Sequence, residues 1–102
     1  MRLYMTELGV SDFAAAVAWW SGVLNCEPSL RDDANGFVLF EVEGGRVALK
    51  CGSASRGTVH FEVNELPEGD VKESVEGYRR VKMTDPDGNV LVLFQWTGER
   101  RA

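Results

Sequence analysis

The sequence predicts an α+β fold made of two similar modules, each with an opening strand, a helix or its remnant, and a set of antiparallel strands. Two local patterns support this prediction. Residues 2–10 alternate loosely between apolar and polar side chains, as a half-buried strand does, and lead into a helical pattern that ends near Leu24. Two hairpin signals, Gly44-Gly45 and the sequence DPDGN at residues 85–89, are flanked by segments typical of strands.

An internal repeat is the third observation. Residues 7–13 match residues 60–66, and residues 45–50 match residues 88–93. The offset between the matched segments falls from 53 residues to 43, so the second module is the shorter one. Because the missing residues fall where the first module has its helix, the second module is predicted to have a shortened or missing helix.

The predicted helix supplies the apolar face of the first module. Ser11 or Asp12 is expected to cap its start. Its apolar stripe, spaced at helical intervals, consists of Phe13, Val17, Trp20 and Leu24, with Ala16 and Val23 beside it. Trp19 lies off this stripe, which predicts either a half-exposed side chain or a contact with another subunit.

The other segments predict strands, turns and a linker. Strands are expected around residues 28–31 and at 37–43, 46–51, 58–63, 78–83 and 90–94. Residues 52–57 (GSASRG) are typical of a linker, and residues 98–102 of a flexible tail. In the DPDGN turn, Asp85 is expected to act as the cap, and the turn by itself explains both Asp85 and Asp87.

Length, charge and cysteine content limit the kinds of protein to consider. With 102 residues the chain is expected to form one domain, residues 1–102. Its net charge of −5 argues against nucleic acid and anionic membranes as partners, because both require a basic surface. No segment is typical of a leader or a membrane span. Cys26 and Cys51 form no CxxC pair, which favours reduced thiols and a cytoplasmic location; a disulfide between them is left open.

Three segments resemble the vicinal oxygen chelate superfamily, which includes glyoxalases, extradiol dioxygenases and bleomycin-resistance proteins. They are VSDF at 10–13, which enters a helix bearing Trp19-Trp20, VHFEVNEL at 59–66 and DPDGNVLVLFQW at 85–96. The resemblance spans residues 2–96. It implies paired βαβββ modules, at about residues 2–51 and 58–96, that form a cupped, mostly antiparallel sheet with a ligand on its concave face.

The resemblance also implies where enzymes of this superfamily hold a divalent metal: a histidine on the first strand and a carboxylate on the last strand of each module. The corresponding positions here are Met5, Leu49, Thr58 and Val92. These side chains are poor metal ligands, so neither a metal nor another cofactor is expected. A displaced site at Glu7, His60 and Glu62 is the alternative; otherwise His60 hydrogen-bonds one of these carboxylates in a polar patch.

The leading functional prediction is a metal-free protein of the bleomycin-resistance type, which sequesters a small organic ligand, with antibiotic resistance as the implied role. No catalytic residue is predicted. Strand parity puts the expected ligand-binding residues on the concave face: Met5, Glu7, Thr58, His60, Glu62, Val92, Phe94 and Trp96. The carboxylates favour a ligand with an amine or guanidine, and Trp96 can stack on a flat or cationic group.

Three alternatives stay open. The concave residues could simply fill a core, leaving no room for a ligand. The protein could be a glyoxalase-related lyase, isomerase or dioxygenase, with the displaced metal or with one Glu as a general base. It could also be an interaction module without a small ligand. A homodimer is expected in addition, because the second module has no full helix to cover its apolar face and Trp19 of a second copy could cover it. The residues of this face are Val59, Phe61, Val63, Leu91 and Leu93.

Overall fold

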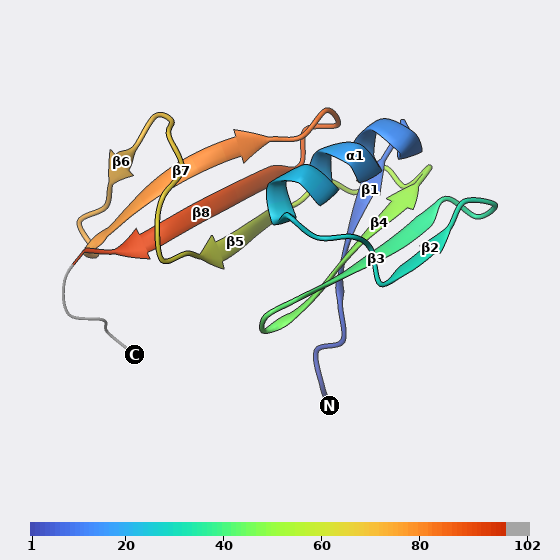
Figure 1. Ribbon diagram of the computed structural model, residues 1–102, viewed down its shortest axis with the longest axis horizontal. Helices are drawn as coiled ribbons and strands as arrows, with labels where there is room; N and C mark the ends of the chain where they lie inside the picture. Colours follow the sequence, from blue (N-terminus) through green and yellow to red (C-terminus); the bar gives the residue numbers. More distant parts are fainter. Residues whose placement is uncertain (98–102) are drawn as a thin grey trace. The chain divides into compact units, whose positions relative to one another are not determined.

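One helix and eight strands are formed by residues 1–97, the part of the chain that this computed structural model describes. In chain order they are β1 (Thr6–Val10), α1 (Phe13–Leu24), β2 (Leu30–Asp32), β3 (Phe37–Val42), β4 (Gly45–Cys51), β5 (Thr58–Glu62), β6 (Lys72–Glu73), β7 (Tyr78–Thr84) and β8 (Val90–Trp96) (Figure 1). Within the described residues no helix has both the length and the apolar character needed to cross a membrane. The tail predicted at residues 98–102 lies outside the described residues.

The strands form two four-stranded sheets of the same topology. Their orders are β1-β4-β3-β2 and β5-β8-β7-β6. In each sheet the opening strand pairs in parallel with the last strand of its module, and the other pairs are antiparallel. This confirms the predicted α+β fold of paired βαβββ modules with mostly antiparallel pairing. Residues 63–71 contain no helix, so the predicted loss of the second helix is confirmed as well.

The chain divides into two compact units that do not coincide with the two modules. The first unit comprises residues 1–57 together with residues 85–89, and the second comprises residues 58–84 and the chain from Val90 on. The DPDGN turn between β7 and β8 therefore belongs to the first unit. The expectation of a single domain stays a prediction.

Helix α1 forms as the sequence predicts. Asp12 caps it, because its side chain accepts a hydrogen bond of 3.1 Å from the backbone N–H of Ala15. The helix ends at Asn25, which has the left-handed backbone conformation (φ 54°) that commonly terminates helices. Trp19 is half-exposed, which is one of its two predicted settings, and its ring packs edge-on against Trp20 with centroids 5.2 Å apart.

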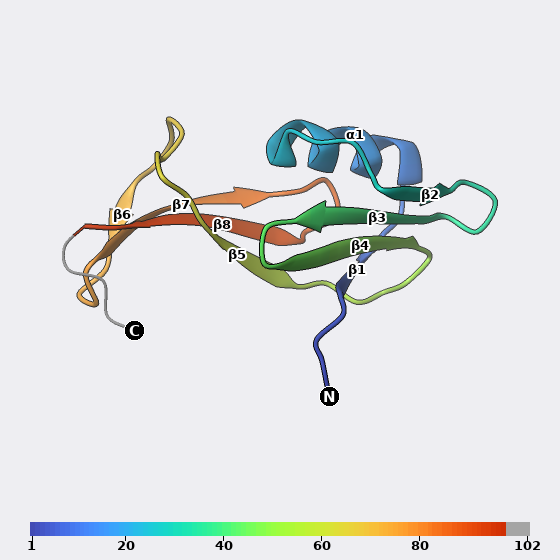
Figure 2. The ribbon, with the colours of Figure 1, turned by 60° about the horizontal axis from the view of Figure 1, so that its bottom comes forward.

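The core of the first unit lies between α1 and one face of its sheet (Figure 2). The helix buries Ala16, Val17 and Trp20, and the sheet contributes the fully buried side chains Val10, Val38, Phe40 and Leu49. Burying a side chain of this kind contributes roughly 1.5–3 kcal/mol, so this interface is the main source of stability in the unit. Cys26 and Cys51 are both free thiols, as predicted.

An extended segment takes part of the place of the missing helix in the second unit. Gly69 of this segment lies against Val81 of β7, since a Cβ added to Gly69 would be 3.0 Å from Val81 Cγ1. On the same side of the sheet Leu91 is fully buried, whereas Phe61 and Leu93 are only half-buried. The segment therefore covers the middle of this face but not all of it.

Two predicted boundaries are wrong. The opening strand begins at Thr6 and not at residue 2, so Met5 precedes it. In the first hairpin Val42 pairs with Gly45, so the turn residues are Glu43 and Gly44, and Gly45 already belongs to β4. Gly44 has a φ of 91°, the left-handed conformation that a two-residue hairpin turn requires, and this explains why a glycine is needed at that position.

Candidate functional site

Six of the predicted ligand-binding residues lie on one face of the second sheet. In the pairing of β5 with β8, His60 is opposite Val92 and Glu62 is opposite Phe94. Because side chains alternate along a strand, Thr58 and Trp96 point to the same side as these four. Thr58, His60 and Glu62 are exposed, whereas Val92 is buried. Their role in binding a ligand stays a prediction.

The other two predicted site residues, Met5 and Glu7, belong to the first unit. Met5 is half-buried directly before β1, and Glu7 is exposed in β1, where it pairs with Ala48. Leu49, one of the positions where the resemblance implies a metal ligand, pairs with Leu8 and is fully buried.

Strand β7 adds four residues to the same face, none of which was predicted from the sequence. Tyr78 is opposite Trp96, Arg80 is opposite Phe94, Lys82 is opposite Val92 and Thr84 is opposite Val90. The sequence contained enough information to place them there, since β7 alternates like β8 and the DPDGN turn pairs the two strands. We call the surface formed by these strands the β5–β8–β7 face: Thr58, His60, Glu62, Tyr78, Arg80, Lys82, Thr84, Val90, Val92, Phe94 and Trp96.

Three aromatic rings pack together at one end of this face. Tyr78, Phe94 and Trp96 form an aromatic cluster in which each pair of ring centroids is 5.7 Å apart, with interplanar angles of 63°, 84° and 88°. Such edge-to-face contacts hold aromatic rings in fixed positions. All three side chains are half-buried, so part of each ring remains accessible. The Nε1–H of Trp96 is buried and donates to no acceptor among the described residues.

A second polar cluster lies in the first unit and is centred on Asp85, which is only 4% exposed. Its Oδ1 accepts hydrogen bonds from the backbone N–H groups of Asp87 (2.9 Å) and Asn89 (2.8 Å), which closes the turn. Its Oδ2 accepts from the indole N–H of Trp20 (2.9 Å) and from the side-chain amide of Asn89 (3.0 Å). The predicted cap is confirmed, and the same carboxylate also anchors the buried tryptophan of α1.

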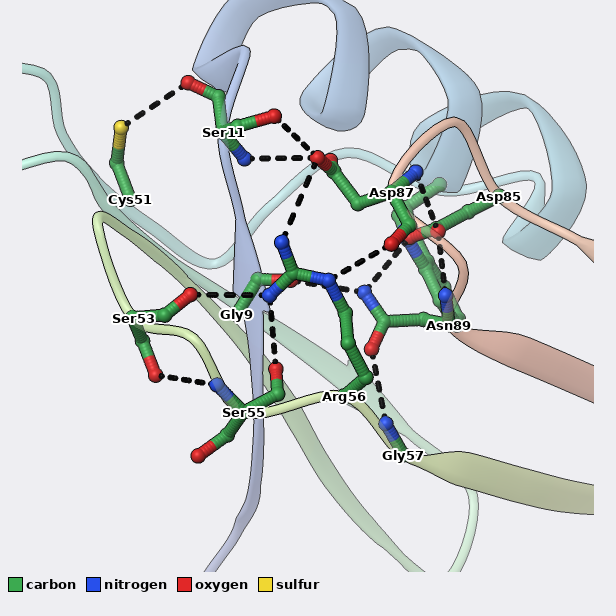
Figure 3. A network of polar contacts seen from close by, with 11 residues as sticks. Gly9, Ser11, Cys51, Ser53, Ser55, Arg56, Gly57, Asp85, Asp87 and Asn89 are labelled. Atoms are coloured by element: carbon green, nitrogen blue, oxygen red, sulfur yellow. Dashed lines mark hydrogen bonds and ion pairs between the residues drawn. The ribbon is translucent and has the colours of Figure 1, made fainter.

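Asn89 connects this turn to β1 and to the segment before β5 (Figure 3). Its side-chain amide donates to the carbonyl oxygen of Gly9 at 2.9 Å as well as to Asp85, and its Oδ1 accepts from the backbone N–H of Gly57 at 3.0 Å. The side chain is fully buried, and both its donor and acceptor groups have partners. It therefore avoids the cost of an unsatisfied buried amide.

Asp87 reaches the start of the helix and the segment predicted as a linker. Its Oδ1 accepts from the backbone N–H of Ser11 at 3.0 Å and from the Ser11 hydroxyl, and it lies 3.8 Å from the guanidinium of Arg56. Arg56 in turn donates to the carbonyl oxygens of Asp87 (2.7 Å), Ser53 (3.0 Å) and Ser55 (3.1 Å). Residues 52–57 are therefore not a free linker, because these hydrogen bonds hold them against β1 and the turn.

We call this cluster the turn network: Gly9, Ser11, Trp20, Arg56, Gly57, Asp85, Asp87 and Asn89. It contains a hydroxyl and two carboxylates, but the chain's one histidine, His60, lies in β5 of the other unit. The Ser11 hydroxyl donates directly to Asp87, and the hydrogen bonds of Asp85 are all to groups of the fold. The contacts of the turn network all serve to hold the first unit together, so no ligand is needed to explain them. Asp85 and Asp87 also bind groups outside the turn, so the prediction that the turn alone explains both aspartates was incomplete.

Neither of the two candidate sets of ligand residues fits a divalent metal ion. The positions implied by the family resemblance carry Met5, Leu49, Thr58 and Val92. In residues 1–97 no three His, Cys, Asp or Glu side chains are grouped so that they could hold a metal ion, and this includes Glu7, His60 and Glu62. A bound divalent ion needs about three good oxygen or nitrogen ligands from the protein. The displaced metal site therefore has no support in the described residues.

Comparisons with known proteins identify the fold. No protein-family model matches the sequence, and no curated protein does so either. A glyoxalase/bleomycin resistance protein from Catenulispora acidiphila superposes with a TM-score of 0.76 at 20% identity, covering 92% of this chain and 98% of that one. Lactoylglutathione lyase from Agrobacterium tumefaciens gives a TM-score of 0.77 at 18% identity and covers 92% of each chain.

A glyoxalase/bleomycin resistance protein/dioxygenase from Nocardioides gives a TM-score of 0.77 at 16% identity, covering 99% of this chain and 87% of that one. The chain thus has the fold shared by glyoxalases, bleomycin-resistance proteins and dioxygenases of this group. The resemblance to the vicinal oxygen chelate superfamily, inferred from three short segments, is confirmed at the level of the fold. Proteins named for different activities share it, so the fold alone does not assign an activity to this chain.

Proposed function

We propose that the protein binds a small organic ligand on the β5–β8–β7 face, without a metal, in the manner of a bleomycin-resistance protein. The observation that carries the proposal is the aromatic cluster, in which the indole N–H of Trp96 has no acceptor among residues 1–97. A buried donor without an acceptor costs about 1–3 kcal/mol, and a ligand with a hydrogen-bond acceptor would remove this cost. Small-molecule sites are also usually lined by aromatic side chains with a few polar groups among them, as this face is.

Trp96 should report ligand binding. Titration of the wild type with flat aromatic compounds of different charge is expected to change the tryptophan fluorescence. Trp96→Leu, whose affinity is measured by calorimetry because the reporter is lost, should weaken any binding about tenfold because one stacking surface and one donor are lost. Trp19→Phe is the matched control, since Trp19 lies on α1 of the first unit and should leave the affinity unchanged. If no compound changes the fluorescence of the folded protein, the interaction-module alternative replaces this proposal.

No observation among the described residues favours the enzymatic alternative. A glyoxalase-related lyase, isomerase or dioxygenase would need either the displaced metal or a carboxylate placed as a general base. Glu7, His60 and Glu62 are not grouped as a metal site. The likeness to lactoylglutathione lyase supports the common fold and goes no further at 18% identity.

A homodimer is the second part of the proposal. Val59, Phe61 and Leu93 stay half-buried on the side of the second sheet that has no helix, and Trp19 is half-exposed on a helix without a single charged residue. A second copy would bury these surfaces. Sedimentation equilibrium at micromolar concentration should give a dimer for the wild type and a monomer for Phe61→Asp.

Val75→Asp is the control for this measurement, because Val75 is fully exposed in a turn and its substitution should leave the dimer intact. A wild-type protein that sediments as a monodisperse monomer would contradict the dimer. In that case the extended segment that contains Gly69 would be sufficient cover for the second sheet.

A further inference from the structure

The charges on the β5–β8–β7 face point to the chemical class of the ligand. We propose that this face takes a flat aromatic anion, such as an aryl carboxylate, whose ring packs against the aromatic cluster and whose anionic group binds Arg80 and Lys82. The inference rests on the proposed function and reverses the charge expected from the sequence. The cationic ligand was expected because of Glu7 in β1 and Glu62 in β5, without the two basic residues of β7.

The cationic groups of this face outnumber its carboxylates. Arg80 and Lys82 of β7 lie on it, and Lys72 of β6 is opposite Arg80 in the same row. Lys72 is paired with Asp70 at 3.4 Å, but neither Arg80 nor Lys82 has an ion pair within residues 1–97. Glu62 is the one carboxylate that the strands of this sheet contribute to the face.

Glu62 lies in the same row as Arg80, on the strand beyond Phe94. The pairing aligns Lys72, Arg80, Phe94 and Glu62 in one row across the sheet, so the strand of Phe94 separates Arg80 from Glu62. Neighbouring strands are about 4.8 Å apart, which puts the backbones of Arg80 and Glu62 about 10 Å apart. Arg80 and Lys82 are about 7 Å apart along one strand, within reach of a single carboxylate between them.

The net charge of −5 does not outweigh this local arrangement. At physiological ionic strength charges are largely screened beyond about 8 Å, so a bound group feels chiefly its nearest neighbours. An arginine guanidinium also matches a carboxylate in shape, because it can donate two parallel hydrogen bonds to it.

The aromatic cluster points to the same ligand class. The rows of Tyr78–Trp96 and Arg80–Phe94 are adjacent, so a ring that lies over Phe94 and Trp96 has its edge near Arg80. Trp96 Nε1, the buried polar atom of the cluster that has no partner among the described residues, is a donor and calls for an acceptor. A carboxylate or a ring oxygen supplies an acceptor, and an ammonium group does not.

The test compares three probes with the same ring and different charge: 2-naphthoate, 2-naphthamide and protonated 2-naphthylmethylamine. Affinities are measured on the full-length 15N-labelled protein from the NMR shift of the Trp96 indole N–H, assigned with Trp96→Phe. Naphthoate should bind about tenfold more tightly than the amine, since charge-assisted hydrogen bonds are the stronger ones. Arg80→Gln should weaken naphthoate about tenfold and leave naphthamide unchanged, and Lys82→Gln should act in the same direction.

Arg79→Gln is the matched control. Arg79 is the next residue of the same strand, points to the opposite face and donates to Gln95 at 3.2 Å, so its loss should not change the affinity for naphthoate. Tighter binding of the amine, or equal effects of Arg79→Gln and Arg80→Gln, would overturn the anion while leaving the binding face in place. If none of the three probes moves the Trp96 signal of the folded protein, the proposed function fails and this inference fails with it.

Discussion

Asp85→Ala is expected to lower the free energy of unfolding by about 3–5 kcal/mol, because each buried donor left without an acceptor costs about 1–3 kcal/mol. The substitution removes the acceptor for Trp20 Nε1 and for three nitrogens of the turn itself. The indole of Trp20 and the amide of Asn89 are both in fully buried side chains, so water cannot replace the carboxylate. Urea denaturation followed by circular dichroism measures the change as a lower midpoint at a constant slope.

Asp70→Ala is the control for this experiment, because Asp70 is exposed and pairs only with the exposed Lys72. Its loss should change stability by less than about 0.5 kcal/mol. Trp20→Phe should fall between the two variants, since it removes one donor to Asp85 and keeps a ring in the core. Equal stability of Asp85→Ala and Asp70→Ala would mean that the turn network contributes nothing beyond the turn.

Gly9→Ala is expected to destabilise the protein by roughly 2–4 kcal/mol, combining overpacking with the loss of a hydrogen bond. A Cβ at Gly9 would overlap the carbonyl oxygen of Ser53 and lie 2.5 Å from that of Ser55, and both are backbone atoms. The backbone N–H of Gly9 donates to the Ser55 carbonyl at 2.8 Å, so the added methyl group would also push this acceptor away.

Gly22→Ala provides a control of opposite sign. Gly22 lies within α1, and a Cβ there would meet no atom within 4 Å. Alanine in a helix is favoured over glycine by roughly 0.8–1 kcal/mol, so thermal and urea unfolding should both show a gain. If Gly9→Ala were as stable as the wild type, residues 52–57 would be able to move away from β1, as the prediction of a linker implied.

Those parts of the fold that depend on local signals could be predicted from the sequence. Helix α1, its Asp12 cap, the hairpin at Gly44 and the DPDGN turn follow from residues close to one another in the chain. The repeat supplied the pairing of modules and the loss of the second helix. The start of β1 could not be predicted, because residues 2–5 alternate like a strand and only pairing with β4 decides where the strand begins.

The candidate site was predicted less completely. Thr58, His60, Glu62, Val92, Phe94 and Trp96 were assigned to one face by strand parity, and the pairing of β5 with β8 gives the same grouping. Tyr78, Arg80 and Lys82 follow from the same parity rule applied to β7, so their omission was avoidable. The contact of Asp85 with Trp20 was not predictable, because no local pattern links residues 65 positions apart.

The turn network makes the completion of the first unit a late event during synthesis of the chain. Its hydrogen bonds join residues separated by 65, 76 and 80 positions, so Trp20, Ser11 and the Gly9 carbonyl wait for partners encoded near the end of the sequence. At a translation rate of about 5–20 residues per second, this delay lasts several seconds. Contacts between residues so far apart in the chain slow folding. A fragment that ends before Asp85 also leaves the buried indole of Trp20 without its hydrogen-bond acceptor. The N-terminal module is therefore a poor candidate for expression on its own, although its sequence reads as a complete βαβββ unit.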